Sequence, residues 1–159
     1  MLKRIWLKIV NIFWNLIYPE WTDKQVYEFY DQFSNYFEFA AYLQASKFQY
    51  KPDGMNILPI YRIDTFARPN QVLARKFYNC SDTMRLFSEF IKYKKCADSF
   101  EEIFLHNGEI GNWHYIMLIS DQGRSYIQSN IFVNLAMPEQ IVEYKKEYKH
   151  WDVIDKWQR

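Results

Sequence analysis

Apolar and polar positions change their spacing along the chain, from a helical period in the first part to strand-like alternation later. Five stretches have the periodicity of helices: 1–18, 22–46, 69–76, 80–94 and 138–150. Local signals support their ends. Pro19 ends the first helix, Thr22 and Gln25 form a predicted capping box, and Pro69 and Pro138 suit the first turn of a helix. The pattern therefore predicts a mainly helical first part.

After Asp98 the apolar positions alternate as in strands. The predicted strands span residues 102–106, 113–120 and 125–132. Residues 121–124 form a hairpin turn between the last two, and residues 51–54 form an earlier turn followed by a loop with a short strand to Ile63. Helices first and strands later indicate an α+β fold with an antiparallel sheet that carries His114. We expect one domain over residues 1–159.

Residues 1–18 contain an apolar run that is interrupted by polar side chains. Lys8, Asn11 and Asn15 fall on one stripe with Arg4, and no small-residue cleavage site follows, so we do not interpret the run as a signal peptide. The run is too short and too polar to span a bilayer. We favour an amphipathic helix packed on the core. The alternatives are a helix at a membrane interface or one that docks on a protein partner.

Composition and charge narrow the function classes. The net charge is +1 and no block of Lys or Arg stands out, so we expect no nucleic-acid partner. The aromatic content of 20% reflects either codon bias or a surface for a protein partner. Cys80 and Cys96 lie at the front and just past the end of one predicted helix, too far apart for a disulfide. A reducing, cytoplasmic compartment is the simpler interpretation.

The helix predicted to run to Lys94 begins at Cys80 or at Asn79, so Cys80 lies in its first turn. A helix start favours the thiolate, and a neutral imidazole on a nearby strand would complete its deprotonation, which makes His114 the candidate base. A three-residue hairpin loop would place Asn130 on the face of His114, whereas a two-residue loop would place Ser129 and Ile131 there. We prefer Asn130, because its amide oxygen can fix the imidazole tautomer.

Two other interpretations of these residues stay open. A buried cysteine is commonly a small apolar side chain, and a strand histidine is commonly a hydrogen-bonded core residue. A metal site would use Cys80, Cys96, His106 and His114, but these residues include no closely spaced pair of ligands, so we expect no metal. We assign His150 to the last helix as a solvated or C-terminal charge.

The segment from Asp64 to Asn130 resembles the transglutaminase-like superfamily, especially its bacterial cysteine proteinase-like branch with a papain-like fold. Four features carry the resemblance: Phe66, the Pro69-led short helix, Cys80-Ser81-Asp82 at the helix start, and the His114-led apolar strand followed by Gly123, Tyr126 and Ser129-Asn130. The resemblance implies a core over residues 64–132. It also implies that Cys80 is the nucleophile and His114 the base. Ser129 stands where the family typically has Asp, and Asn130 beside it is the expected substitute.

The resemblance implies a thiol-dependent amidase or peptidase, or an acyl transferase, that acts on a protein or peptide amide and needs no cofactor. The alternative hypothesis is a catalytically degenerate relative that serves as a structural or protein-binding module and is encoded by a phage. That setting rests on the small size, the compositional skew and the serine at position 129.

Overall fold

The computed structural model describes residues 18–50, 67–108 and 113–159. Within these ranges the helices are α2 Asp23–Tyr30, α3 Tyr36–Ala45, α4 Pro69–Arg75, α5 Cys80–Lys94 and α6 Pro138–Glu147. The long strands are β3 Ser99–His106, β4 Trp113–Asp121, β5 Arg124–Ser129, β6 Phe132–Leu135 and β7 His150–Gln158. Two short strands, β1 Gln49–Tyr50 and β2 Phe77–Tyr78, pair in parallel. The α+β prediction is confirmed.

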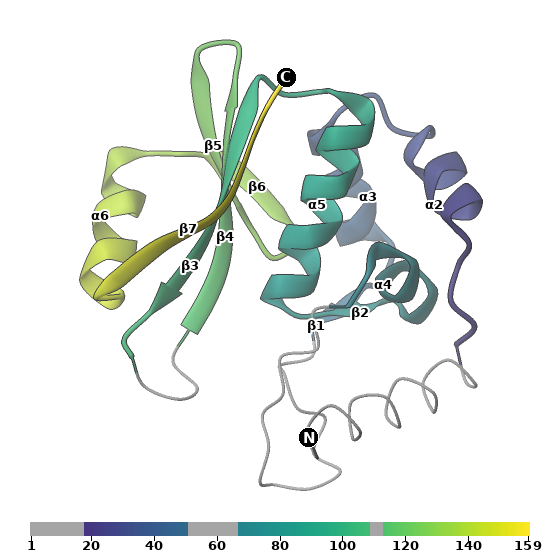
Figure 1. The fold of residues 1–159 in the computed structure, drawn as a ribbon, viewed down its shortest axis with the longest axis horizontal. Coiled ribbons are helices and arrows are strands. Elements are labelled where there is room, and N and C mark those ends of the chain that lie inside the picture. Colours follow the sequence, from purple (N-terminus) through teal and green to yellow (C-terminus); the bar gives the residue numbers. More distant parts are fainter. Residues whose placement is uncertain (1–17, 51–66, 109–112) are drawn as a thin grey trace, which may run out of the picture.

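The five long strands form one antiparallel sheet in the order β6-β5-β4-β3-β7 (Figure 1). Helices α2 to α5 lie on one side of this sheet and α6 lies on the other. His114 is the second residue of the central strand β4, so the predicted sheet does carry it.

Each face of the sheet packs on its own core. On the α5 face, Met117 and Ile119 join aromatic side chains of the helices, and Phe39 and Phe90 stack with ring centroids 4.5 Å apart. On the α6 face, a smaller core contains Ile103, Leu105, Ile116 and Ile127. Burying one such side chain stabilises the fold by roughly 1.5–3 kcal/mol. The strand alternation therefore sends neighbouring residues of β4 into different cores.

The predicted helix over residues 22–46 is two helices. Its start is confirmed, because the Gln25 backbone N–H donates to Thr22 Oγ1 at 3.3 Å while Gln25 Oε1 accepts from the Thr22 N–H at 2.9 Å. The chain leaves the first helix after Tyr30, and the second helix begins at Tyr36. Its N-cap is Asn35, whose Oδ1 accepts from the N–H groups of Phe37 and Glu38. An asparagine side chain that bonds to nearby backbone N–H groups competes with continuation of a helix. The spacing of apolar residues alone does not reveal this break.

The predictions for α4 and α5 are confirmed. Pro69 is the first residue of α4, and Cys80 is the first residue of α5. Asn79 is the N-cap of α5, and its Oδ1 accepts from the Asp82 N–H at 2.8 Å. The α5 start is therefore defined by a side-chain cap as well as by the apolar pattern.

Three predictions for the second half of the chain need correction. The strand expected over 125–132 is two strands, β5 and β6, separated by a turn of Asn130 and Ile131 in which Asn130 has a left-handed φ of 55°. The last helix ends at Glu147 instead of near residue 150, and His150 begins the edge strand β7. The sequence analysis missed β7 because its residues do not alternate cleanly between apolar and polar.

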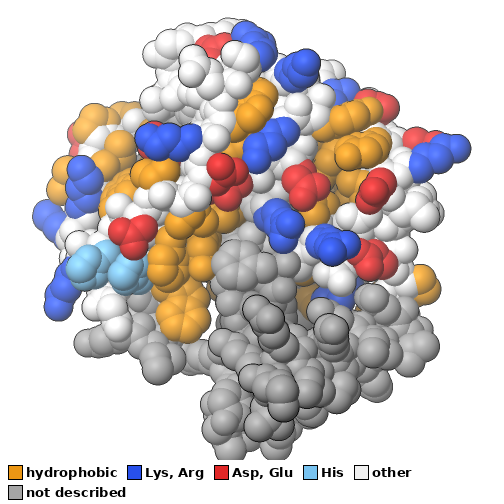
Figure 2. Space-filling model, in the orientation of Figure 1, with side chains coloured by type: hydrophobic (Ala, Val, Ile, Leu, Met, Phe, Trp, Pro, Cys, Tyr) orange, Lys and Arg blue, Asp and Glu red, His pale blue; other side chains and the backbone are white. Residues whose placement is uncertain are grey.

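Several predictions fall on residues outside the described ranges: the helix over 1–18 with its alternatives, the turn at 51–54, and Asp64 and Phe66 of the family resemblance. Among the described helices, none has the length and apolar character required to cross a membrane. Side chains of both charge signs are interspersed over the face shown in Figure 2.

Candidate active site

Cys80 lies at the first position of a helix of 15 residues, and its side chain is buried in the core on the α5 face. The first N–H groups of a helix have no acceptor within the helix, and their dipoles favour negative charge nearby. The helix start therefore favours a thiolate and burial in the apolar core opposes it, so the thiolate at Cys80 stays a prediction.

Asp82 fixes the helix start from within. Its Oδ2 accepts from the Asn79 N–H at 3.3 Å, which completes a capping box, and its Oδ1 accepts from the Ala67 N–H at 2.7 Å. The buried carboxylate thus bonds to two backbone amides that lie 12 residues apart in sequence. It holds the residues before α4 against the turn that carries Cys80.

His114 is half-buried on the α6 face, and its Nε2 lies 2.8 Å from Ser129 Oγ. Burial lowers the pKa of His114, and the negative charge of Glu147 opposes that shift in part. The ring also stacks with Tyr144 of α6, with an interplanar angle of 17°. The lowered pKa favours the neutral imidazole. In the tautomer with the proton on Nε2, donated to Ser129, the Nδ1 atom can accept a proton.

The β4–β5 register decides between the two predicted partners of His114. Asp121 pairs with Arg124 across a two-residue loop, which excludes the three-residue loop on which the preference for Asn130 depended. Ser129 pairs with Ile116 and faces the α6 side with His114. Asn130 is a turn residue whose backbone oxygen accepts from Gln128 Nε2. The prediction of Asn130 as the group that orients the imidazole is therefore corrected to Ser129.

Cys80 and His114 belong to side-chain layers on opposite faces of the sheet. Cys80 shares its core with Tyr115 and Met117, while His114 lies with Ser129 and Tyr144 on the other face. The direct contact predicted between thiol and imidazole stays a prediction.

Tyr148 belongs to the layer on the α6 face. Its side chain packs against the smaller core on the α6 face. Burial, the charge of Glu147 and, less strongly, the charge of Cys80 raise the pKa of Tyr148 to about 12. The thiol of Cys80 is thus close enough to act electrostatically on a hydroxyl of the layer that contains His114.

Sequence reasoning missed the contribution of α6 to this site. Tyr144, Glu147 and Tyr148 are spaced three and four residues apart, so they share one face of a helix and its C-cap. That spacing was visible in the sequence. The sequence did not show that this helix face is turned toward His114, because that depends on how α6 packs on the sheet.

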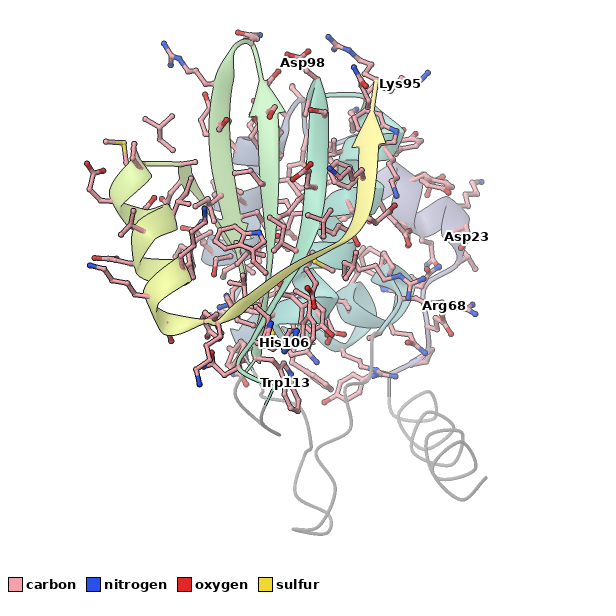
Figure 3. The ribbon with its side chains drawn as sticks, turned by 60° about the vertical axis from the view of Figure 1, so that its left-hand side comes forward. Asp23, Arg68, Lys95, Asp98, His106 and Trp113 are labelled. Atoms are coloured by element: carbon pink, nitrogen blue, oxygen red, sulfur yellow. The ribbon has the colours of Figure 1, made fainter. Side chains whose placement is uncertain are left out.

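The alternative metal set is not brought together. Cys96 follows the C-cap of α5, so roughly 22 Å of helix separates it from Cys80. Burial raises the pKa of Cys96 to about 11. His106 Nε2 bonds to Asp152 Oδ2 of β7 at 2.8 Å. His106 pairs with Trp113 across β3 and β4 at one end of the sheet (Figure 3), and its ring stacks on Phe104 of the α5-face core, away from the face of His114. Within the described ranges, no group of three or more His, Cys, Asp or Glu side chains is arranged to hold a metal ion.

Comparisons with protein-family models, with curated proteins and with solved structures each returned no match. The case for a function therefore rests on the residues of the site.

Proposed function

We propose that the protein is a thiol-dependent amidase, peptidase or acyl transferase in which Cys80 is the nucleophile, His114 the general base and Ser129 the group that orients the base. The observation that carries the proposal is the hydrogen bond between His114 Nε2 and Ser129 Oγ. The bond supports the proposal because Ser129 stands at the position where the sequence resemblance implies the third member of a catalytic triad.

The end of β4 that has no β5 partner supports a contact between the Cys80 thiol and the His114 imidazole. Pairing of β5 with β4 begins at Ile116 and Ser129, so Trp113, His114 and Tyr115 extend past the last β5 pair. A side chain from the α5 face and one from the α6 face can approach each other around this end without passing through the sheet. The electrostatic influence of Cys80 on Tyr148 fits that route.

The proposed chemistry begins when Nδ1 of His114 takes the thiol proton of Cys80. The sulfur then attacks the carbonyl carbon of an amide or ester, and the backbone N–H of Cys80 hydrogen-bonds to the resulting oxyanion. The imidazolium gives its proton to the leaving amine or alcohol as the bond to the carbonyl carbon breaks, and a thioester forms. Water or an amine then attacks the thioester and releases the thiol.

The arrangement of a core helix that begins with cysteine against an antiparallel sheet is also the basis for proposing a papain-like, transglutaminase-like fold. A reduced thiol at position 80 is essential to the reaction, so the proposal includes a reducing compartment. The proposed substrate is a protein or peptide carbonyl.

Alkylation by iodoacetamide across pH tests the proposal. We expect Cys80 to react at pH 6–7 at least tenfold faster than a free thiol, because an imidazole partner and a helix start lower its pKa. His114→Ala should remove that advantage. His150→Ala is the matched control, since His150 lies on the exposed edge strand β7, and should leave the rate unchanged. A wild-type rate no higher than that of a free thiol would refute the proposal.

A second candidate, a protein-binding module, is favoured by exposed apolar side chains on β6 and the start of α6. Phe132, Leu135, Met137 and Val142 are each between 46% and 51% exposed. Co-purification from the native source, with wild type and Leu135→Asp in parallel, tests this role. A defined partner lost in the variant supports it, and a partnerless monomer contradicts it.

A further inference from the structure

The α6 helix covers the face of the sheet that carries His114 (Figure 1). His114 pairs with Leu105 of β3, which is fully buried in the smaller core on that face. Paired residues of neighbouring strands direct their side chains to the same side of a sheet. Ile141, Tyr144 and Tyr148 pack against the same core, and their spacing of three and four residues puts them on one side of the helix. The imidazole and the inner side of α6 therefore share one layer.

Two contacts of different kinds reach the imidazole in this layer. Its Nε2 lies 2.8 Å from Ser129 Oγ of β5. The Tyr144 ring of α6 is nearly parallel to the imidazole, with an interplanar angle of 17° and ring centroids 6.4 Å apart. That separation lies within the range of roughly 4.5–7 Å in which aromatic pairs attract each other, and parallel rings this far apart are offset. The sheet and the helix thus each hold the ring.

The two contacts restrict different motions of His114. The torsion about the Cβ–Cγ bond of histidine has broad minima, so the surroundings decide the plane of the ring. Rotation about this bond moves Nδ1 further than Nε2, because Nε2 lies closer to the rotation axis. A hydrogen bond at Nε2 therefore tolerates a range of ring planes, whereas tilting the imidazole would break its parallel contact with Tyr144. The stack is the contact that limits the direction of Nδ1.

Asn107, the residue after β3, ties the end of α6 to the sheet. Its Nδ2 donates to the Glu147 carbonyl at 2.9 Å, and its Oδ1 accepts from the Lys149 N–H at 2.7 Å. The tie starts from the strand that pairs with β4 at His114. One side chain thus restricts sliding of the last turn of α6 along the sheet, and with it the position of Tyr144.

We infer that Tyr144 is a positioning residue for His114: its ring sets the plane of the imidazole while Ser129 holds Nε2, and Asn107 keeps α6 where the two rings stack. The catalytic meaning of this inference rests on the proposed function, in which Nδ1 takes the proton of Cys80. Aromatic pairing of this kind favours the stacked orientation by roughly two- to tenfold in population. The stack uses the ring of Tyr144 and not its hydroxyl, so phenylalanine should serve equally well.

The test is NMR relaxation of the His114 ring in the full chain, compared among wild type, Tyr144→Phe and Tyr144→Leu. Tyr144→Phe retains the ring, and Tyr144→Leu fills the space with an apolar side chain that has no ring plane. Spectra are recorded above the titration midpoint of His114, so that the ring is neutral in every protein. We expect an ordered ring in wild type and Tyr144→Phe, and in Tyr144→Leu a lower order parameter, as for a mobile group. The rings of His106 and His150 serve as internal controls and should not change.

Unfolding in urea separates positioning from packing. Loss of packing alone would lower the stability of Tyr144→Leu and leave the His114 ring ordered, and that result would overturn the inference. A ring as mobile in Tyr144→Phe as in Tyr144→Leu would also overturn it. Asn107→Ala should loosen the His114 ring in the wild-type background and hardly affect it in the Tyr144→Leu background, because both changes act on the same contact.

The rate of Cys80 alkylation separates this inference from the proposed function. Near neutral pH the rate should fall roughly two- to tenfold in Tyr144→Leu and stay unchanged in Tyr144→Phe. A mobile His114 ring in Tyr144→Leu, together with a wild-type Cys80 that alkylates like a free thiol, would support the positioning role and refute the proposed function alone. An equally ordered ring in wild type and Tyr144→Leu would refute the positioning role, whatever the reactivity of Cys80.

Discussion

Replacement of Ser129 by alanine removes the hydrogen bond that we expect to orient the candidate base. The bond joins His114 Nε2 and Ser129 Oγ at 2.8 Å in a partly buried position. A neutral hydrogen bond contributes about 0.5–1.5 kcal/mol, and a buried donor left without an acceptor costs about 1–3 kcal/mol. Because His114 is only half-buried, we expect a loss of about 1–2 kcal/mol. If this free energy stabilises the tautomer and ring orientation needed for proton transfer, its loss corresponds to roughly a five- to thirtyfold slower reaction of Cys80.

The assay is the second-order rate of Cys80 alkylation between pH 5 and pH 9, with unfolding in urea as a check on the fold. Ser129→Ala should lower the rate near neutral pH and leave the alkaline limit unchanged, where the thiolate forms without a base. Ser129→Asp should restore or exceed the wild-type rate, since a carboxylate at that position accepts the same N–H and adds charge. A Ser129→Ala profile within twofold of wild type at every pH would refute this account of the site.

Two further predictions concern stability. Asp82→Ala removes the carboxylate that accepts from the Asn79 and Ala67 amides, so it should lower the free energy of unfolding by about 2–4 kcal/mol in urea titration; a loss below 0.5 kcal/mol would contradict the anchoring role. Burial lowers the pKa of His114 in the folded state, so the unfolded chain binds the proton more tightly. The free energy of unfolding should therefore fall as the pH drops through about 6.5, and His114→Gln should flatten that dependence; an unchanged slope would contradict it.

Local signals in the sequence were sufficient to predict helix starts, because a single residue type there determines the backbone conformation. Thr22 with Gln25 and Pro69 marked helix starts that the structure confirms. The start of α5 at Cys80 follows from the same kind of evidence, because Asn79 caps it. These contacts are between residues at most four apart, so a single sequence contains the information they need.

Predictions that depended on strand register and on packing were less complete. Whether Ser129 or Asn130 faces His114 depends on one residue in the hairpin loop, and a shift by one residue moves every side chain to the other face. The edge strand β7 has little apolar alternation, because most of its side chains are exposed. The place of Tyr144 against His114 depends on the docking of α6, which involves contacts about 30 residues apart in sequence.

We expect Ser129 and Glu147 to perform together two tasks that a single aspartate performs in a triad. Ser129 hydrogen-bonds to the imidazole, and the negative charge of Glu147 opposes the lowering of the His114 pKa by burial. If so, an aspartate at position 129 should make Glu147 less important. In the Ser129→Asp background, Glu147→Gln should change the His114 midpoint and the alkylation rate less than it does in wild type, since the closer carboxylate dominates. The same two measurements on the four proteins of this double-mutant cycle give the coupling. Effects of Glu147→Gln that are equal in both backgrounds would mean that the two residues act independently, and the division of roles would be wrong.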